Sequence, residues 1–286
     1  MMNTDGIGVF VGVDQSACSR EALAWAAADA AARHTRLTVA SVVDLPRLGD
    51  VPLTGQLLDA ARRAVQNTVD AAVARARTLA PGLAVEGRVL SGNPAAELLL
   101  LADGADEIVV GSRGTSELAA LLLGSVGTQV AEHAHGPAVV VRERPAPGPV
   151  IVAIDNSPHS DAALEYGFAY ADRHGLPLVA LHVYTLAAFA YPVMPYPVAE
   201  ELAVIQVEAA RTAEQNVSRW TEKYPDVEAR TEVVEGRAVH QLVEASRTAS
   251  LLVVGTRGHG GLTGMLLGSV SHGALRHAHC PVAIAR

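Results

Sequence analysis

The feature that most constrains the fold of this chain is a glycine motif that occurs twice. Residues 111 to 126 read GSRGTSELAALLLGSV, and residues 255 to 270 read GTRGHGGLTGMLLGSV. The two glycines around the arginine, the nine-residue spacer and the Gly-Ser-Val end recur 144 positions apart (255 − 111). A period of this length is far too long for a solenoid repeat, and it indicates a duplicated domain.

The rest of the chain supports a duplication. The stretch GVFVGVDQSACSREALAWAAADAAA aligns with GPVIVAIDNSPHSDAALEYGFAYAD, which places Asp14 on Asp155 and Ser16 on Ser157. Between the copies lies RERPAPGPV, residues 142 to 150, in which proline and glycine are typical of a short, stiff linker. We therefore predict two domains, residues 1–144 and 149–286.

Within each half, strand patterns alternate with helix patterns. In the first half, short apolar runs predict strands at VFVGVD, TRLTVASVV, LAVEGRVL, DEIVVG and PAVVVR, the third being polar enough for a sheet edge. Helices are predicted over 17–33 and 55–80, from Pro94, and from Ser125 to His133. The second half repeats this order, with strands near 150, 178, 229, 251 and 282. The pattern predicts two tandem doubly wound, Rossmann-like α/β domains, each a five-stranded parallel sheet with helices on both faces.

Parallel sheets of this kind bind ligands beyond the carboxyl ends of their strands, where the strand order reverses. We expect the reversal between the first and fourth strands, which places Asp14 beside the Gly111 loop and Asp155 beside the Gly255 loop. Glycines allow the backbone to approach a ligand closely, and a helix N-terminus attracts phosphate. A carboxylate suits a ribose hydroxyl or an adenine amino group. Each half therefore has the elements of a nucleotide site.

The motif belongs to neither of the two best-known nucleotide loops. A Walker A loop has a four-residue spacer and a Gly-Lys-Ser/Thr end, whereas this spacer has nine residues and no such end occurs. A dinucleotide fingerprint follows the first strand, whereas the early G-x-G of this chain, Gly6-Ile-Gly8, precedes it.

On these residues the sequence resembles the universal stress protein family in its tandem, ATP-binding form. That family has a motif of Gly, two residues, Gly, nine residues and Gly-Ser/Thr. Its counterparts here are Gly111, Gly114 and Gly124-Ser125, and again Gly255, Gly258 and Gly268-Ser269. The family also has an Asp after the first strand, often followed by Ser, as in Asp14 with Ser16 and Asp155 with Ser157. The resemblance covers nearly the whole chain.

The resemblance implies one ATP in each half, with or without Mg²⁺, between the first and fourth strands. In the first half it places the nucleotide against Gly12, Val13, Asp14, Val42, Gly111, Arg113, Gly114, Gly124, Ser125 and Val126. In the second half the corresponding residues are Ala153, Ile154, Asp155, Val183, Gly255, Arg257, Gly258, Gly268, Ser269 and Val270. Alanine at 153, where the first half has Gly12, predicts a tighter second pocket near the base.

Three functions are open at this point. The first is an ATP-binding stress-response protein that acts as a nucleotide-dependent switch, and the second is a slow Mg²⁺-dependent ATP hydrolase or phosphotransferase. The third is a scaffold with an empty ancestral pocket, which the intact motifs in both halves disfavour. Hydrolysis needs a positioned water, a base and usually a metal, yet the motif argument places Asp14 and Asp155 at the adenosine end. We therefore favour the switch and assign no catalytic residue.

The composition of the chain indicates which partners and which cellular compartment to expect. A formal net charge of −8 argues against nucleic-acid binding, which needs a clustered basic face. The two cysteines lie in different halves, which fits a reducing compartment rather than a disulfide framework. The N-terminus lacks a signal-peptide pattern, and no apolar run is long enough to span a membrane. We expect a cytoplasmic protein with ATP and an unidentified protein as partners.

Two further segments allow alternative interpretations. The histidines of EHAHGP and RHAHCP, with Cys280, could suggest zinc. They also complement a helix C-terminus without any metal, so we predict no metal site.

The loop FAYPVMPYPVAEE, residues 189 to 201, is either a stiff connection or a lid or partner-binding loop. The glycine-rich second spacer predicts a more mobile lid in the second half.

The final strand of each half, PAVVVR and PVAIAR, is an apolar edge that needs covering. The resemblance implies that the two halves pair through this strand as a pseudo-dimer and that two chains associate as a homodimer.

Overall fold

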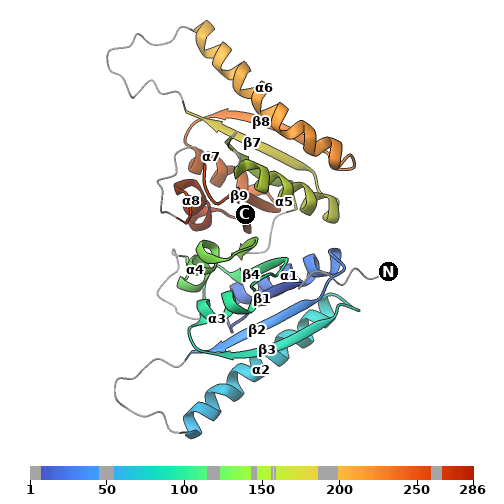
Figure 1. Cartoon of the computed structure of the whole chain (residues 1–286), viewed down its shortest axis with the longest axis vertical. Coiled ribbons are helices and arrows are strands. Elements are labelled where there is room, and N and C mark those ends of the chain that lie inside the picture. Colours follow the sequence, from blue (N-terminus) through green and yellow to red (C-terminus); the bar gives the residue numbers. More distant parts are fainter. Residues whose placement is uncertain are drawn as a thin grey trace, which may run out of the picture. The chain divides into compact units, whose positions relative to one another are not determined.

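The computed structural model describes residues 8–44, 55–114, 123–142, 147–155, 157, 159–185, 199–258 and 266–286. The chain divides into two compact units, Met1–Arg144 and Pro145–Arg286, most of whose helices and strands are labelled in Figure 1. Most of the spacer of each glycine motif and most of the 189–201 loop lie outside the described residues, so the lid hypotheses stay predictions.

The first unit alternates strands and helices as predicted. Its elements are β1 (Val9–Gly12), α1 (Ala17–Ala32), β2 (Leu37–Val43), α2 (Gly55–Leu79), β3 (Val85–Ser91), α3 (Pro94–Leu101), β4 (Glu107–Gly111), α4 (Ser125–His133) and β5 (Ala138–Val141). The strands pair in parallel in the order β3-β2-β1-β4-β5. Because β1 pairs with both β2 and β4, the order reverses at β1, where the sequence predicts it.

The second unit repeats this topology. Its elements are β6 (Val150–Ile154), α5 (His159–His174), β7 (Leu178–Tyr184), α6 (Ala199–Lys223), β8 (Ala229–Glu235), α7 (Ala238–Ala245), a short 3₁₀ turn η2 (Ser246–Thr248), β9 (Leu251–Gly255), α8 (Ser269–His277) and β10 (Val282–Ala285). Its strands pair in parallel in the order β8-β7-β6-β9-β10. The predicted fold class, two tandem Rossmann-like α/β domains with parallel sheets, is confirmed.

Burial explains why these segments fold as they do. The central strands β1 and β4 are apolar apart from Glu107 and almost fully buried, as is typical of strands covered on both faces. Helix α1 presents Ala22, Ala26 and Ala30, all fully buried, so it approaches β1 and β4 closely. Helices α1 and α2 contact each other, and α3 contacts α4. Strand β3, with its exposed polar residues, pairs only with β2 at the sheet edge, as predicted.

A buried ion cluster in the first domain is replaced by other residues at the aligned positions of the second. Arg33, at the C-terminus of α1, forms ion pairs with Asp29 and with Glu107 at the start of β4. Both carboxylates are buried, at 0% and 1% exposure. In the second domain the alignment places Tyr170, His174 and Leu251 at these positions, and the rings of Tyr170 and His174 pack with centroids 4.2 Å apart. In the first domain Arg33 therefore pairs with two buried carboxylates.

We predict that Arg33→Met lowers the free energy of unfolding of the first domain by about 3–5 kcal/mol, because two carboxylates stay buried without this cation. Replacing all three groups together, by Asp29→Leu, Arg33→Met and Glu107→Leu, should cost less than the single change.

Each domain holds one buried tryptophan, Trp25 in α1 and Trp220 in α6. A Trp220→Phe background therefore lets urea denaturation followed by fluorescence report the first domain alone. A triple variant no more stable than Arg33→Met would contradict the prediction.

Candidate functional site

The loop after β1 is held by a set of short-range hydrogen bonds around Asp14. The backbone N–H of Asp14 donates to Ser19 Oγ at 2.9 Å, and the N–H of Ser16 donates to Asp14 Oδ1 at 2.9 Å. Ser16 also caps α1, because its Oγ accepts from the N–H of Ser19 at 3.1 Å. The Asp14 carboxylate thus has one oxygen bound to the loop and the other, Oδ2, on the side of Gly114.

A side-chain hydrogen bond joins this loop to the loop after β4. Ser16 Oγ donates to the backbone carbonyl of Arg113 at 3.1 Å, across 97 residues of sequence. Glycine is needed where the loops meet, because a Cβ at Gly111 would lie 3.0 Å from the backbone of Cys18 and Ser19. A Cβ at Gly114 would lie 3.0 Å from Asp14 Oδ2. The predicted neighbourhood of Asp14 and the Gly111 loop is therefore present.

The N-terminus of α4 lies beside the Asp14 loop and the loop after β4. Gly124 is its N-cap, with extended backbone and no side-chain cap hydrogen bond, and its own N–H donates to the carbonyl of Ser112 at 2.8 Å. The first intrahelical bond runs from the N–H of Thr128 to the carbonyl of Gly124. The backbone N–H groups of the first turn of a helix are the donors that bind phosphate in many proteins.

These elements enclose a cavity of about 310 Å³ in the first domain. All ten residues predicted for this half line it. The others that line it are Ser19, Ala40, Ser41, Asp44, Pro94, Leu98, Val110 and Gly127. A cavity of this size lies at the lower end of the range for small-molecule and cofactor sites.

The second domain repeats the arrangement around Asp155. Its N–H donates to Ser160 Oγ at 3.0 Å, and its Oδ1 accepts from the N–H of Ser157 and from the Ser160 hydroxyl. A Cβ at Gly258 would lie only 2.1 Å from Asp155 Oδ2. Gly268 caps α8 without a side-chain hydrogen bond, and its N–H donates to the Thr256 carbonyl at 2.7 Å.

The remaining predicted residues of the second half lie at the same strand and helix ends. Ala153 and Ile154 end β6, Val183 lies in β7, and Gly255 ends β9. Arg257 follows β9, and Ser269 and Val270 form the first turn of α8. The buried His182 bonds the Ile154 carbonyl through Nδ1 at 3.0 Å, at the position that Ser41 occupies in the first half. The two sites thus share their polar anchors and differ along the second strand.

Sequence reasoning missed the serine that fixes the aspartate loop. Ser19 and Ser160 occupy the same place in DQSACS and DNSPHS. The signal was present, because both halves have Asp-x-Ser-x-x-Ser after the first strand. Other lining residues, such as Leu98 of α3, have no sequence signal of their own, since a buried leucine on a helix predicts only a core position.

The structure describes little that could hold a metal. Among the described residues, no three His, Cys, Asp or Glu side chains are grouped so as to bind an ion. Burial raises the pKa of the Cys280 thiol to about 12, so the thiol is protonated at neutral pH and is a poor ligand. His135 Nδ1 lies 2.8 Å from Asp103 Oδ1, an ordinary surface contact. In the part of the chain that is described, no helix is long and apolar enough to cross a membrane.

Fold and site together define a tandem α/β protein with a glycine-rich site at the switch point of each parallel sheet. A family model described as the universal stress protein family matches residues 9–142 and again residues 148–286. A universal stress protein of Mycobacterium tuberculosis is 34% identical over 304 residues, which cover 98% of this chain and 95% of the relative. A second one from that organism is 36% identical over 291 residues, with 98% and 97% coverage.

Solved structures agree on the fold. A universal stress protein from Archaeoglobus fulgidus DSM 4304 superposes with a TM-score of 0.70 at 20% identity, over 97% of this chain and 98% of that chain. A putative universal stress protein from Pseudomonas aeruginosa UCBPP-PA14 gives a TM-score of 0.63 at 15% identity, over 97% and 92%. This chain belongs to the universal stress protein family.

The Ser16 hydrogen bonds provide a test of how the first site is held. We predict that Ser16→Ala lowers the free energy of unfolding of the first domain by about 1–2 kcal/mol, because it removes the α1 cap and the bond to the Arg113 carbonyl. Ser157→Ala is the matched control, because Ser157 Oγ is buried and has no hydrogen-bond partner in the described part of the chain. Urea denaturation in the single-tryptophan backgrounds measures both, and equal losses would contradict the assignment.

Proposed function

We propose that this protein binds ATP, one molecule in each domain at the carboxyl ends of β1 and β4 and of β6 and β9, and that it acts as a nucleotide-dependent switch in the stress response. The proposal rests on one arrangement of two features that both domains share. In both domains a carboxylate after the first strand, Asp14 or Asp155, lies against a glycine of the repeated motif. In both domains the helix that follows the motif begins without a side-chain cap.

Each part of this arrangement has a role toward a nucleotide. A carboxylate oxygen of Asp14 accepts a hydrogen bond from a ribose hydroxyl or from the adenine amino group, as ribose-binding carboxylates do. The uncapped first turn of α4 supplies backbone donors and the positive end of a helix dipole to the phosphates. Arg113, which lines the same cavity, adds a permanent positive charge.

The two sites are proposed to differ in affinity. Gly12 lines the first cavity, where its missing Cβ would lie 2.7 Å from Leu98. Ala153 places a methyl group at the corresponding position of the second domain. Gly258 is also closer to its carboxylate than Gly114 is, 2.1 Å against 3.0 Å for a built Cβ. These features leave less room around Asp155, and we propose weaker binding in the second domain.

Gly114→Glu and Gly258→Glu test the sites one at a time. Each adds a carboxylate beside Asp14 or Asp155 and fills the space next to it, so we predict that each variant loses the nucleotide of its own domain and keeps the other. The double variant should bind none. The measurement is isothermal titration calorimetry with ATP and Mg²⁺, together with the nucleotide released by acid from the purified protein.

Gly55→Glu is the matched control, because it adds the same side chain where nothing lies within 4 Å of the built Cβ. It should keep the wild-type stoichiometry. Unchanged stoichiometry in both Gly114→Glu and Gly258→Glu would overturn the proposed sites. No nucleotide and no ATP-induced thermal shift in the wild type would overturn the proposed function. Sustained phosphate release from ATP would favour the hydrolase instead of the switch.

A further inference from the structure

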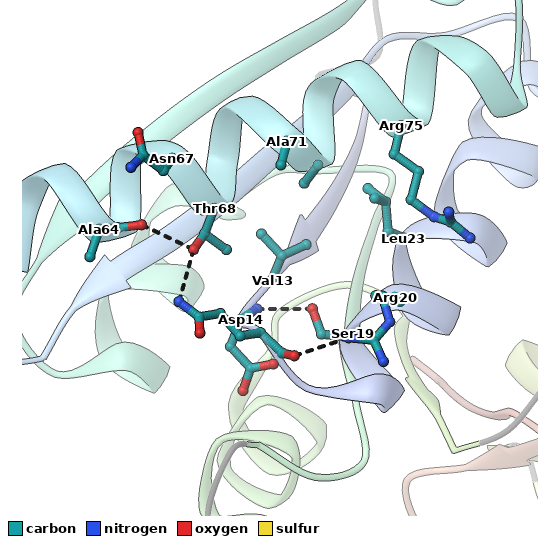
Figure 2. Close-up of a pocket in the computed structure, with 12 residues that line it drawn as sticks. Val13, Asp14, Ser19, Arg20, Leu23, Ala64, Asn67, Thr68, Ala71 and Arg75 are labelled. Carbon is teal, nitrogen blue, oxygen red and sulfur yellow. Dashed lines mark hydrogen bonds between the residues drawn. The ribbon is translucent and has the colours of Figure 1, made fainter.

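A second cavity in the first domain lies on the other side of the Asp14 loop, between α1 and α2. It has a volume of about 520 Å³, larger than the cavity at the glycine motif. The two cavities share Val13, Asp14 and Ser19. Figure 2 shows this α1–α2 pocket, with α2 running above it and the start of α1 below.

The pocket has a polar end and a cationic end. At the first end, Gln15 Nε2 donates to Thr68 Oγ1 at 3.4 Å, and Thr68 in turn donates to the Ala64 carbonyl at 3.1 Å. At the other end, Figure 2 shows Arg75 of α2 and Arg20 of α1, with Leu23 of α1 between them. The wall between the ends is apolar, and Leu23 is buried at 2% exposure.

The two arginines are not neutralised within the pocket. Arg20 donates from Nη1 to the carbonyl of Gln15 at 3.1 Å, which leaves its charge without a counterion there. Arg75 is exposed and has no hydrogen bond or ion pair with any described residue. Asp14 is the acidic group that lines the pocket, and its carboxylate binds the Ser16 N–H and faces Gly114, toward the other cavity.

In the second domain the residues aligned with these two arginines form an ion pair. Arg20 aligns with Asp161, which follows Ser160 as Arg20 follows Ser19, and Arg75 aligns with Arg219 of α6. Asp161 and Arg219 form an ion pair that bridges α5 to α6. Duplication thus produced an acid–arginine bridge in one domain and two arginines in the other. Two cations that line one pocket, neither paired with an acid there, indicate a site for an anion.

The size of the pocket also follows from residues that differ between the two domains. Ala64, Ala71 and Ala72 of α2 line it, and the aligned residues of α6 are Glu208, Gln215 and Asn216. The alanines leave space against α1 that longer side chains would occupy. We propose that the α1–α2 pocket of the first domain binds a small organic carboxylate, with its carboxylate on Arg20 and Arg75 and its apolar body over Leu23 and the alanines.

The test uses octanoate as the probe, with octylammonium as a probe of equal length and opposite charge. Titrations of the full chain without nucleotide, followed by calorimetry and by amide NMR shifts, should show saturable binding of one octanoate, with shifts in α1 and α2. Octylammonium should not bind. Arg20→Asp, which gives the first domain the acid–arginine pairing of the second, should weaken octanoate binding at least about tenfold, since it removes a charge-assisted contact and neutralises Arg75.

Two further variants separate the parts of the proposal. Ala71→Gln, which introduces the second domain's residue, should weaken binding by filling the pocket while both arginines remain. Arg63→Gln lies on α2 outside the pocket and should leave the octanoate affinity unchanged. The Trp25 unfolding transition confirms that each variant is folded.

Failure of octanoate to bind at millimolar concentration would overturn the proposal. Equal binding to the wild type and Arg20→Asp, or binding of octylammonium as strong as that of octanoate, would overturn it as well. None of these outcomes depends on whether the glycine-motif sites bind ATP, because the titrations contain no nucleotide.

Discussion

The hydrogen bond from Ser16 Oγ to the Arg113 carbonyl is the interaction on which the first site depends. Parallel strands bring β1 and β4 side by side, but their loops diverge into α1 and toward α4, and nothing in the sheet fixes one loop against the other. Ser16 does so because one hydroxyl both caps α1 and bonds the loop after β4. The Asp14 carboxylate is bound to the same serine's N–H, so the cap, the carboxylate and the glycine loop are positioned together.

Topology and most of the site could be predicted because they depend on local patterns that both halves repeat. Apolar strands between amphipathic helices specify a parallel sheet, and the duplicated glycines specify where backbone must approach a ligand. The predicted bounds of helix α4, Ser125 to His133, are those of the structure. The Asp14 neighbourhood follows from strand order alone, since β1 must end beside β4 at the reversal.

The remainder could not be predicted because it depends on contacts between segments with no periodic signal. The sequence around Arg33 does not show that this residue pairs with Glu107, 74 residues away. A charged residue at the end of a helix is ordinarily exposed. The α1–α2 pocket depends on which alanines of α2 face α1, and an alanine has the same sequence signature on a packed face as on an open one. Such features become visible only when the two domains are compared position by position in three dimensions.

That comparison shows where each copy has kept its chemistry and where it has diverged. Around Asp14 and Asp155 the hydrogen bonds to the following serines are nearly identical, although the halves differ in most surrounding residues. Away from that site the contacts at aligned positions differ. The first domain buries an ion cluster at Arg33, and the second packs Tyr170 on His174 instead. Where the second domain has an acid–arginine bridge, the first domain has two arginines that line a pocket. The bridge is not needed for the fold, because the strands pair in the same order in both domains. In the first domain the two arginines are therefore available to the carboxylate ligand that we propose.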